Sequence, residues 1–587
     1  MANRLPILAT LVWLLSVICP DAAAWPPLGA APSPPDDGWS ESVQPPGSEE
    51  HPGHQLPYAL LGRSGSTFVV AASDSKHREW ADYVCDGVND QVEIQAAINA
   101  LPAHGGTVTL LDGTFYISAH IVPRDYTHLR GQGMTQTVLK GTSALYKSLI
   151  ERNPYNTPEN PTSPDHPLVG FQLTDLQIDG SEMPLPPGQP GGKGIFFVYH
   201  TDCLFRNVYV RNTPATCFGN DFGHRVLYEN CVAEGGGRSQ PAVGGHGFGI
   251  GTGGYPEEVV IIAHCIALYN YHNGFTFEEV DDEAVSGYAQ FSNCYAEGNE
   301  RGFVFHSATP HGGVYRAKVT GCSAVNNPLV GIYIYRYSRD IIVANNFVAN
   351  SRVGIDSERG QNRNLIITGN YVTGSEWFGM RLRGTDVVVD GNIVSRSGRD
   401  GIRLEGFSTP SLRMLIVNNI IYNNSQAGGY NGIRIDGREA GQPVHDVVIR
   451  NNRIYDDQTP PKQQYGVRII ENVTKVTIEG NRFSGNAQGA VYVPNLPSVQ
   501  EITVQANEGF ATEASGTAIV PQGSTVVEVK HGLDWTPPIT SISVTPTNDL
   551  GQAQKFWISD VGPATFRINV DRDPGSQARF VWQIRGR

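Results

Sequence analysis

The chain has 587 residues, of which 40% are hydrophobic and 17% charged, and its formal net charge is −14. This surplus of acidic residues argues against nucleic acid and against an anionic membrane surface as general partners. It leaves open an acidic ligand that binds to a local basic patch.

The N-terminal 57 residues predict export and a disordered leader. Residues 1–24 carry Arg4, an apolar run from Leu5 to Cys19 and three consecutive alanines, which together are typical of a cleavable signal peptide. Residues 25–57 are rich in Pro, Gly, Ser and acidic side chains, a composition that favours disorder. No later segment approaches 18 consecutive apolar residues, so we expect no membrane span in a protein that is secreted or held at the cell surface.

Residues 58–140 are expected to form an N-terminal cap. The stretch from Asp90 to Leu101 has apolar residues at helical spacing after an acidic start, which predicts a helix. Two strand-like runs follow at Thr107–Leu111 and Thr114–Ser118. A helix and flanking strands of this kind are suited to covering the open end of a stacked β structure, which otherwise exposes unpaired strands and apolar core.

A repeat dominates residues 141–510. A Cys or Asn, preceded in nine of ten cases by Gly or Asn, recurs along the chain, and each is followed by a Gly that opens an apolar strand. The Cys or Asn positions are Cys231, Cys265, Cys294, Cys322, Asn346, Asn370, Asn392, Asn419, Asn452 and Asn481, and the glycines are Gly247, Gly274, Gly302, Gly331, Gly354, Gly379, Gly401, Gly432, Gly466 and Gly489.

Such a short β-rich unit without helical periodicity predicts a parallel β solenoid, in which each turn buries its apolar side chains only against its neighbours. Stacked Asn side chains would bond to one another and to the turn backbone, because an unpaired buried amide is costly. A buried Cys fits the same column without a partner. Side chains one turn apart are too widely spaced for an unstrained disulfide, so we expect mostly free thiols.

Residues 511–587 change character. Short alternating runs such as Val526–Val529 and Phe566–Val570, separated by Pro, Gly and Asp, predict a small antiparallel β domain. It could bind carbohydrate, support a homo-oligomer or simply cap the solenoid. The predicted fold class is therefore all-β: a right-handed single-stranded parallel β-helix with an N-terminal helix cap and a small C-terminal antiparallel β domain.

The segment from Ala81 to Ser118 (ADYVCDGVNDQVEIQAAINALPAHGGTVTLLDGTFYIS), followed by the Asn and Cys column, resembles the right-handed parallel β-helix proteins of the pectin lyase superfamily. The resemblance covers the cap and the coil. It implies this fold and a carbohydrate ligand more strongly than any one reaction, because lyases, hydrolases, epimerases, tailspikes and adhesins share the fold.

The glycine-led strands predict where a ligand would bind. Alternation places the second and fourth residues after each Gly on the outside of the coil, where they would form a continuous stripe along the helix axis. Its aromatic, carboxylate and guanidinium groups suit a sugar chain bearing uronate groups. The predicted substrate-binding residues are Gly249, Gly251, Tyr333, Asp356, Glu358, Arg381, Arg383 and Arg403. From Arg403 onward the stripe could equally be a ladder of ion pairs.

The candidate site centres on the turns from His246 to Glu358, where residues 234–246, 279–290 and 307–318 are expected to rise as loops beside the strands. Two outward glycines would give a floor without side chains. Beside it, Gly245-His246-Gly247 resembles the Gly-His-Gly element of polygalacturonase-type glycoside hydrolases, although the other acidic and basic elements of those enzymes have no counterpart here.

The residue types favour elimination or epimerisation at a uronate. Such a reaction needs a group that neutralises the carboxylate and a base that removes the proton at carbon 5. The predicted catalytic residues are His246, Glu278, Arg301, His306 and Tyr335, a set similar in kind to that of alginate lyases and mannuronan epimerases. No cofactor is required, but a Ca²⁺ ion could be held by Glu279, Asp281 and Asp282 together with Glu278.

The sequence therefore predicts a secreted enzyme whose partner is an acidic polysaccharide. A polygalacturonase-like hydrolase is one alternative, and it would need two carboxyls roughly 5–10 Å apart, for which Asp221 with Glu278 or Asp356 with Glu358 are candidates. A non-catalytic glycan-binding adhesin is the other.

Overall fold

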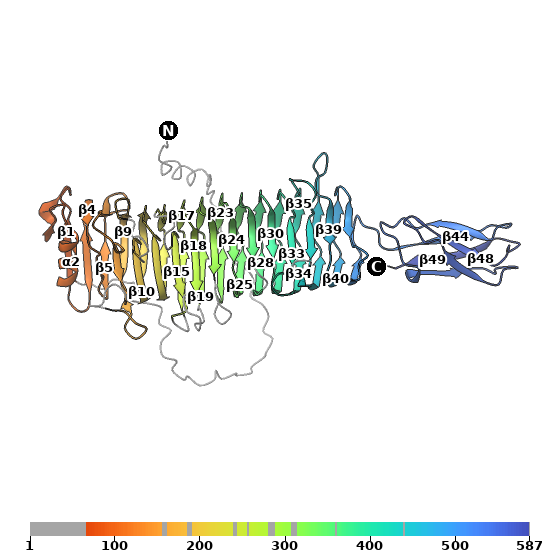
Figure 1. Ribbon diagram of the computed structural model, residues 1–587, viewed down its shortest axis with the longest axis horizontal. Helices are drawn as coiled ribbons and strands as arrows, with labels where there is room; N and C mark the ends of the chain where they lie inside the picture. The colour runs from red at the N-terminus through yellow and green to blue at the C-terminus, as the bar shows by residue number, and fades with distance from the viewer. Residues whose placement is uncertain are drawn as a thin grey trace, which may run out of the picture. The chain divides into compact units, whose positions relative to one another are not determined.

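The computed structural model describes residues 66–154, 161–184, 191–238, 244–254, 258–279, 288–306, 314–358, 361–437 and 441–585. These residues form a right-handed parallel β-helix followed by two small antiparallel sheets, as the sequence predicts (Figure 1). The predicted signal peptide, the leader and residues 58–65 of the cap lie outside this part of the chain. Within it, no helix is both long and apolar enough to cross a bilayer.

The N-terminal cap is built as expected. Helix α2 (Gln91–Ala100) buries Ile94, Ala97 and Ile98 against the first coil, and it follows β1 (Ser66–Ala71), the short 3-10 helix η2 (Arg78–Trp80) and β2 (Tyr83–Val84). Asp90 starts α2 and accepts hydrogen bonds from the backbone of Gly87 (2.9 Å) and Tyr116 (2.8 Å), which ties the helix to the coil. The first coil strands are β3 (Gly106–Leu110), β4 (Gly113–Ile117), β5 (Thr127–Arg130) and β6 (Thr137–Gly141).

The glycine-led strands form one continuous parallel sheet, called here the glycine-led sheet. Its strands are β7 (Ile150–Arg152), β8 (Leu168–Val169), β10 (Ile195–Thr201), β12 (Phe218–His224), β15 (Phe248–Thr252), β18 (Asn273–Glu279), β21 (Arg301–His306), β24 (Val330–Ile334), β27 (Val353–Ser357), β30 (Phe378–Leu382), β33 (Ile402–Glu405), β36 (Ile433–Asp436), β39 (Tyr465–Ile469) and β42 (Gly489–Tyr492).

The other sheet completes each turn with two strands. After β9 (Gln172–Asp179) and β11 (Leu204–Arg211), the first strand of each turn is β13 (Val226–Glu229), β16 (Val259–Ala263), β19 (Tyr288–Ser292), β22 (Ala317–Thr320), β25 (Arg339–Ala344), β28 (Arg363–Thr368), β31 (Thr385–Asp390), β34 (Ser411–Val417), β37 (Val444–Arg450), β40 (Val473–Glu479) and β43 (Val499–Gln505). The second is β14 (Val232–Glu234), β17 (Ile266–Leu268), β20 (Tyr295–Glu297), β23 (Ser323–Val325), β26 (Phe347–Ala349), β29 (Tyr371–Thr373), β32 (Ile393–Ser395), β35 (Ile420–Tyr422), β38 (Arg453–Tyr455) and β41 (Arg482–Ser484).

The Cys and Asn column forms the ladder that the sequence predicts. Each Asn side chain accepts a hydrogen bond from the backbone N–H of the previous turn, as at Asn370 N to Asn392 Oδ1 (2.9 Å), and its amide donates to the next Asn. The residue before each ladder position has a φ between 52° and 65°. Only Gly and Asn adopt this left-handed region readily, which explains why they precede nine of the ten positions.

A second ladder runs beside the first and was not predicted. The amide of Asn270 donates to Asn299 (2.9 Å) and the backbone N–H of Asn299 donates to Asn327 (3.1 Å). The column continues through buried serines and returns to amide side chains at Asn424. Its residue type changes along the chain, so no single letter marks it in the sequence.

A single core fills the coil, with stacked phenylalanines such as Phe248, Phe275 and Phe303 in successive turns. All seven cysteines of the described residues are free and buried, which confirms the expectation of unpaired thiols: Cys85, Cys203, Cys217, Cys231, Cys265, Cys294 and Cys322.

The C-terminal segment has the antiparallel strands that the sequence predicts. One sheet joins β44 (Ala514–Val520), β49 (Ala578–Ile584) and β46 (Ile542–Pro546), and the other joins β45 (Val526–Lys530), β48 (Thr565–Val570) and β47 (Phe556–Ser559), with the 3-10 helix η4 (Ile539–Ser541) before β46. They enclose their own core, which contains Phe566, Ile568 and Phe580. Strand β44 was missed because its sequence, ASGTAIV, begins with small polar residues.

Candidate functional site

The outward residues of the glycine-led sheet lie in two parallel rows. Row one contains Gly219, Gly249, Thr276, Val304, Tyr333, Asp356, Arg381, Arg403, Arg434, Arg468 and Tyr492, each paired in register with the next. Row two contains Asp221, Gly251, Glu278, His306, Tyr335, Glu358, Arg383, Glu405 and Asp436. Residues far apart in the sequence are thus brought side by side, as the alternation predicts.

The N-terminal end of the rows is a floor of glycines. Gly219 and Gly249 are neighbours in row one, and Gly251 separates Asp221 from Glu278 in row two. A Cβ atom on Gly249 would lie 3.1 Å from the His246 ring, so a side chain there would crowd it. These glycines place no side chain above the backbone, and all three are buried in the structure.

Cationic groups and imidazoles border this floor. Lys193 lies over the backbone of Gly219, with its Nζ atom 3.4 Å from the carbonyl oxygen. Burial, reinforced by His272, Lys193, His306 and Arg301, lowers the pKa of His246 to about 3. Lys193 and Arg301 thus bring two positive charges to the border of the floor, where they disfavour a charge on His246.

Two carboxyls flank Gly251 with different electrostatic surroundings. Burial raises the pKa of Asp221 to about 6, against the opposing effect of Lys193, and the charge of Glu278 raises it further. The Gly251 N–H donates a hydrogen bond to Asp221 (3.2 Å). The two carboxyls stand two strands apart, about 9.6 Å at the backbone, with only a glycine between them.

His306 and Tyr335 form a stacked pair in the next two turns of row two. Their ring centroids are 4.7 Å apart and the rings are nearly parallel. Burial lowers the pKa of His306, with Arg336 and Arg301 acting in the same direction, so its imidazole is neutral near pH 7. Arg336 donates a hydrogen bond to the Tyr335 hydroxyl oxygen, which orients the phenol beside His306. The pair therefore has the parts of a base and an acid.

Arg301 lies at the edge of the same region, as the first residue of β21. Its guanidinium is 3.1 Å from Glu300, which also pairs with His272 (2.9 Å), and it sits 5.4 Å from the Tyr333 ring centroid. The Tyr333 hydroxyl donates to Glu358, and this bond together with burial raises the Tyr333 pKa. Arg301 remains more than a quarter exposed, so it can contact a ligand.

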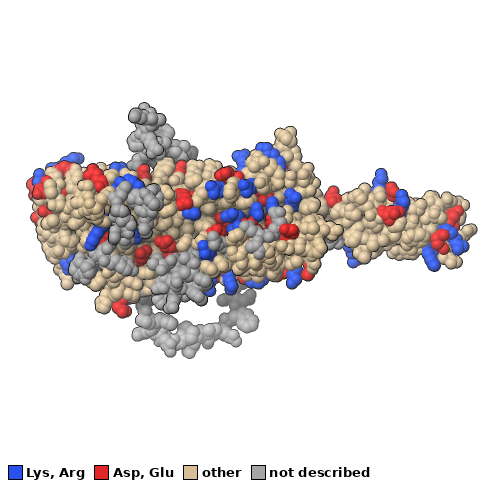
Figure 2. All heavy atoms as spheres, viewed as in Figure 1, with Lys and Arg blue, Asp and Glu red and all other residues tan. Residues whose placement is uncertain are grey.

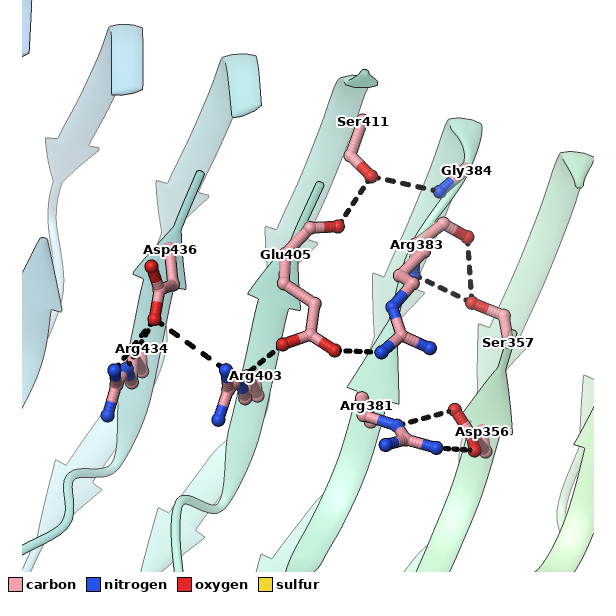
Figure 3. Close-up of polar contacts among 10 residues, drawn as sticks. All are labelled: Asp356, Ser357, Arg381, Arg383, Gly384, Arg403, Glu405, Ser411, Arg434 and Asp436. Carbon is pink, nitrogen blue, oxygen red and sulfur yellow. Dashed lines mark hydrogen bonds and ion pairs between the residues drawn. The ribbon is translucent and has the colours of Figure 1, made fainter. Parts of the chain in front are cut away.

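The C-terminal half of the rows is a ladder of ion pairs (Figure 3). Arg381 makes a two-point contact with Asp356, Arg383 pairs with Glu405, and Arg403 contacts both Glu405 (2.5 Å) and Asp436 (3.6 Å). Arg434 completes the ladder by pairing with Asp436 (2.7 Å). On the surface, basic and acidic side chains lie intermingled over the strands between β24 and β39 (Figure 2).

Burial of this ladder separates the predicted binding residues into two groups. The side chains of Asp356 and Arg383 are at most 5% exposed and are bonded to protein partners. These two side chains stabilise the coil rather than face solvent. The same is largely true of Arg381 and Arg403. The second group comprises Gly249 and Gly251, which belong to the glycine floor, and Tyr333 and Glu358, which lie nearer to it than the ladder does. Their contact with a ligand stays a prediction.

The predicted loops and the predicted metal site fall largely outside the described residues. Residues 239–243, 280–287 and 307–313 are not described, and they include Asp281 and Asp282. The side chain of Glu279 is likewise not described. Binding of Ca²⁺ by these residues therefore stays a prediction.

The structure adds residues that the sequence reasoning did not select. Lys193, His272 and Arg336 are not among the predicted site residues, and Asp221 is predicted only as a candidate for the hydrolase. The alignment of turns could have found part of this set, because His272 and Glu300 each stand two residues before a strand-opening glycine. Applying the repeat to positions before the glycine as well as after it would have placed them beside the floor.

Two family models match the chain. Residues 82–300 match "Rhamnogalacturonase A/epimerase, pectate lyase-like", and residues 311–436 and 414–508 match "Right handed beta helix region". No curated protein matches the chain in sequence.

Several solved structures share the fold at low sequence identity. Gene product 12 of bacteriophage phi29 in its pre-mature form has a TM-score of 0.52 at 17% identity, covering 69% of this chain and 55% of its own. The A-module of the mannuronan C-5 epimerase AlgE6 of Azotobacter vinelandii has 0.39 at 18%, covering 72% and 96%. PfbA, a surface adhesin of Streptococcus pneumoniae, has 0.38 at 13%, covering 75% and 96%. Of these three, gene product 12 alone has a TM-score above 0.5, and at 17% identity its likeness shows the fold alone.

Proposed function

We propose that this right-handed parallel β-helix protein, whose residues 82–300 match a pectate lyase-like family model, is a secreted enzyme acting on an acidic, uronate-containing polysaccharide. The observation that carries the proposal is the cluster at the glycine floor, where the cations Lys193 and Arg301 lie beside three imidazoles in a protein of net charge −14. A carboxylate-bearing sugar is attracted to such a local field.

The proposed reaction begins with removal of the proton at carbon 5 of a uronate by the neutral imidazole of His306. The electron pair left behind moves into the carboxylate, whose growing charge Arg301 or Lys193 stabilises. In elimination, the bond between carbon 4 and the bridging oxygen breaks and Tyr335 donates a proton to the leaving oxygen. In epimerisation, Tyr335 returns a proton to the opposite face of carbon 5 and the chain stays intact.

Incubation with a panel of polyuronates in deuterated water tests this proposal. Elimination produces an unsaturated sugar that absorbs ultraviolet light, and epimerisation introduces deuterium at carbon 5, which NMR detects. We expect one of these two signals on at least one polymer. Binding without either signal would indicate a glycan-binding adhesin and contradict the proposal.

A hydrolase is a second candidate, favoured by the two carboxyls that flank Gly251. Asp221 has a raised pKa and can donate a proton, and the carboxyl of Glu278 lies about 9.6 Å away at the backbone. This arrangement resembles the pair of carboxyls that inverting glycosidases use. In this mechanism Asp221 protonates the leaving oxygen and Glu278 activates a water molecule.

The pH dependence of the reaction separates the two mechanisms. Hydrolysis needs protonated Asp221, so its rate falls as pH rises through about 6. Proton removal needs neutral His306, whose pKa lies below the ordinary value, so its rate rises with pH in the acidic range and persists above pH 6. A profile of kcat/KM from acidic to neutral pH, with reducing ends and ultraviolet absorbance followed together, distinguishes them. A rate that falls above pH 6 would contradict His306 as the base.

A further inference from the structure

The outer face of the other sheet carries an aliphatic column that nothing in the described chain covers. Its members point outward from successive strands and pair in register: Ile342, Ile366, Val388, Leu415 and Val448 on β25, β28, β31, β34 and β37. Ile342 and Ile366 are 40% and 42% exposed, and Leu415 is 36% exposed. Thr477 and Thr503 extend the column on β40 and β43.

A column of charged residues runs beside it. Two positions before Val388, Leu415, Val448 and Thr477, the chain has Asp386, Arg413, Asp446 and Lys475 on β31, β34, β37 and β40. Arg413 also pairs with Asp386 within the chain (2.6 Å), and the same position holds Asn364 on β28 and Glu501 on β43. A shallow hollow is lined by Arg413, Leu415, Asp446, Val448 and Lys475, which places both columns on one surface. Over these four turns the charges read negative, positive, negative, positive.

This order of charges is self-complementary: when a second copy of the face lies opposite with its helix axis reversed, each negative residue faces a positive one. Consider a two-fold axis in the contact plane that runs parallel to the strands, between β34 and β37. This axis reverses the order of the turns in the second copy. It keeps each column opposite the same column of the second copy. Arg413 then faces Asp446 of the second copy, and Asp386 faces its Lys475. Leu415 faces Val448 in the same way, and Val388 faces Thr477. In the remaining outward column, Asp390 faces Glu479 of the second copy, and this like-charge contact weakens the pairing.

We propose that this face, β28 to β43, pairs with the same face of a second copy of the chain in an antiparallel homodimer. Six strands spaced about 4.8 Å apart and three outward columns spaced about 6.8 Å apart give a flat contact of roughly 600 Å² on each copy. This is small for a protein interface, so the dimer is weak and forms in a concentration-dependent way. Its contact surface leaves the glycine-led sheet free.

Sedimentation of the full chain over a range of concentrations tests the dimer. We expect reversible dimerisation that weakens with added salt and that Leu415→Lys weakens by at least about tenfold. Ile420→Lys is the matched control, because Ile420 is equally exposed on β35, a strand outside this face (Figure 1). A protein that stays monomeric at every concentration would overturn the proposal, and this is the result expected if the N-terminal residues cover the face. An equal effect of both substitutions would overturn it as well.

Two further pairs of variants test the antiparallel arrangement. A chain with Asp386→Lys and Asp446→Lys and a chain with Arg413→Glu and Lys475→Glu should each remain monomeric alone but pair with one another, because every substituted position then faces an opposite charge. For the register, Val388→Cys chains mixed with Thr477→Cys chains should form a disulfide-linked dimer, whereas neither does so alone. Cross-linking of Val388→Cys with itself would place the axis elsewhere and contradict this pairing.

Discussion

Replacing His306 by asparagine is expected to lower kcat on a uronate polymer by at least about a hundredfold, because the base that removes the carbon 5 proton is lost. Affinity for the polymer should change little, since Arg301 and Lys193 remain to bind the carboxylate. Steady-state kinetics combined with calorimetric titration of the same polymer measures both quantities.

His264→Asn is the matched control for this experiment. His264 lies at the corner before the ladder residue Cys265, with a φ of 54°, where Asn is the residue type used in most other turns. We therefore expect full activity and unchanged or slightly higher stability. A His306→Asn enzyme whose rate stays near that of the unchanged protein would move the chemistry to another group.

Replacing Glu405 by leucine is expected to reduce the free energy of unfolding by about 3–5 kcal/mol. Glu405 is 2% exposed and holds both Arg383, which is 4% exposed, and Arg403 (Figure 3). Removing the carboxylate leaves a buried guanidinium without its partner, and that uncompensated charge is the main source of the loss. Denaturant titration monitored by circular dichroism provides the measurement.

The control is Glu508→Gln, which breaks an exposed ion pair with Arg482 and should change stability by less than about 1 kcal/mol. Adding Arg383→Met to Glu405→Leu should recover part of the loss, because the charge that lost its partner is then removed as well. If Glu405→Leu behaved like the control, the ladder would be open to solvent, and Arg383 would return to its predicted role in ligand binding.

The sequence identifies the architecture because the fold places strict local demands on a few positions. The left-handed backbone before each ladder residue admits Gly and Asn most readily, and His264 is the one exception. The outward order of Glu278, His306 and Tyr335 follows from strand alternation once the glycines are aligned. These features depend on neighbouring residues and on a repeat, both of which are visible in a single chain.

Burial and pairing could not be predicted in the same way. Asp356 and Arg383 read as exposed polar residues of the stripe, yet each is buried through a contact with the adjacent turn. Which charged groups pair depends on side-chain conformation and on the segments that cover the sheet, neither of which has a sequence pattern. For the same reason, Lys193 and Arg336 emerge as neighbours of the glycine floor only from three-dimensional contacts.

The column of unpaired thiols has a consequence for how the molecule matures. Its four sulfur atoms lie inside the coil at Cys231, Cys265, Cys294 and Cys322, out of contact with solvent oxidants. No cross-link among the described cysteines has to be made or reshuffled for the coil to close, so its assembly is indifferent to the redox state of the compartment in which translation or export takes place. Each finished turn serves as the template on which the next turn folds, so the coil does not depend on disulfide bonds for its ordered structure.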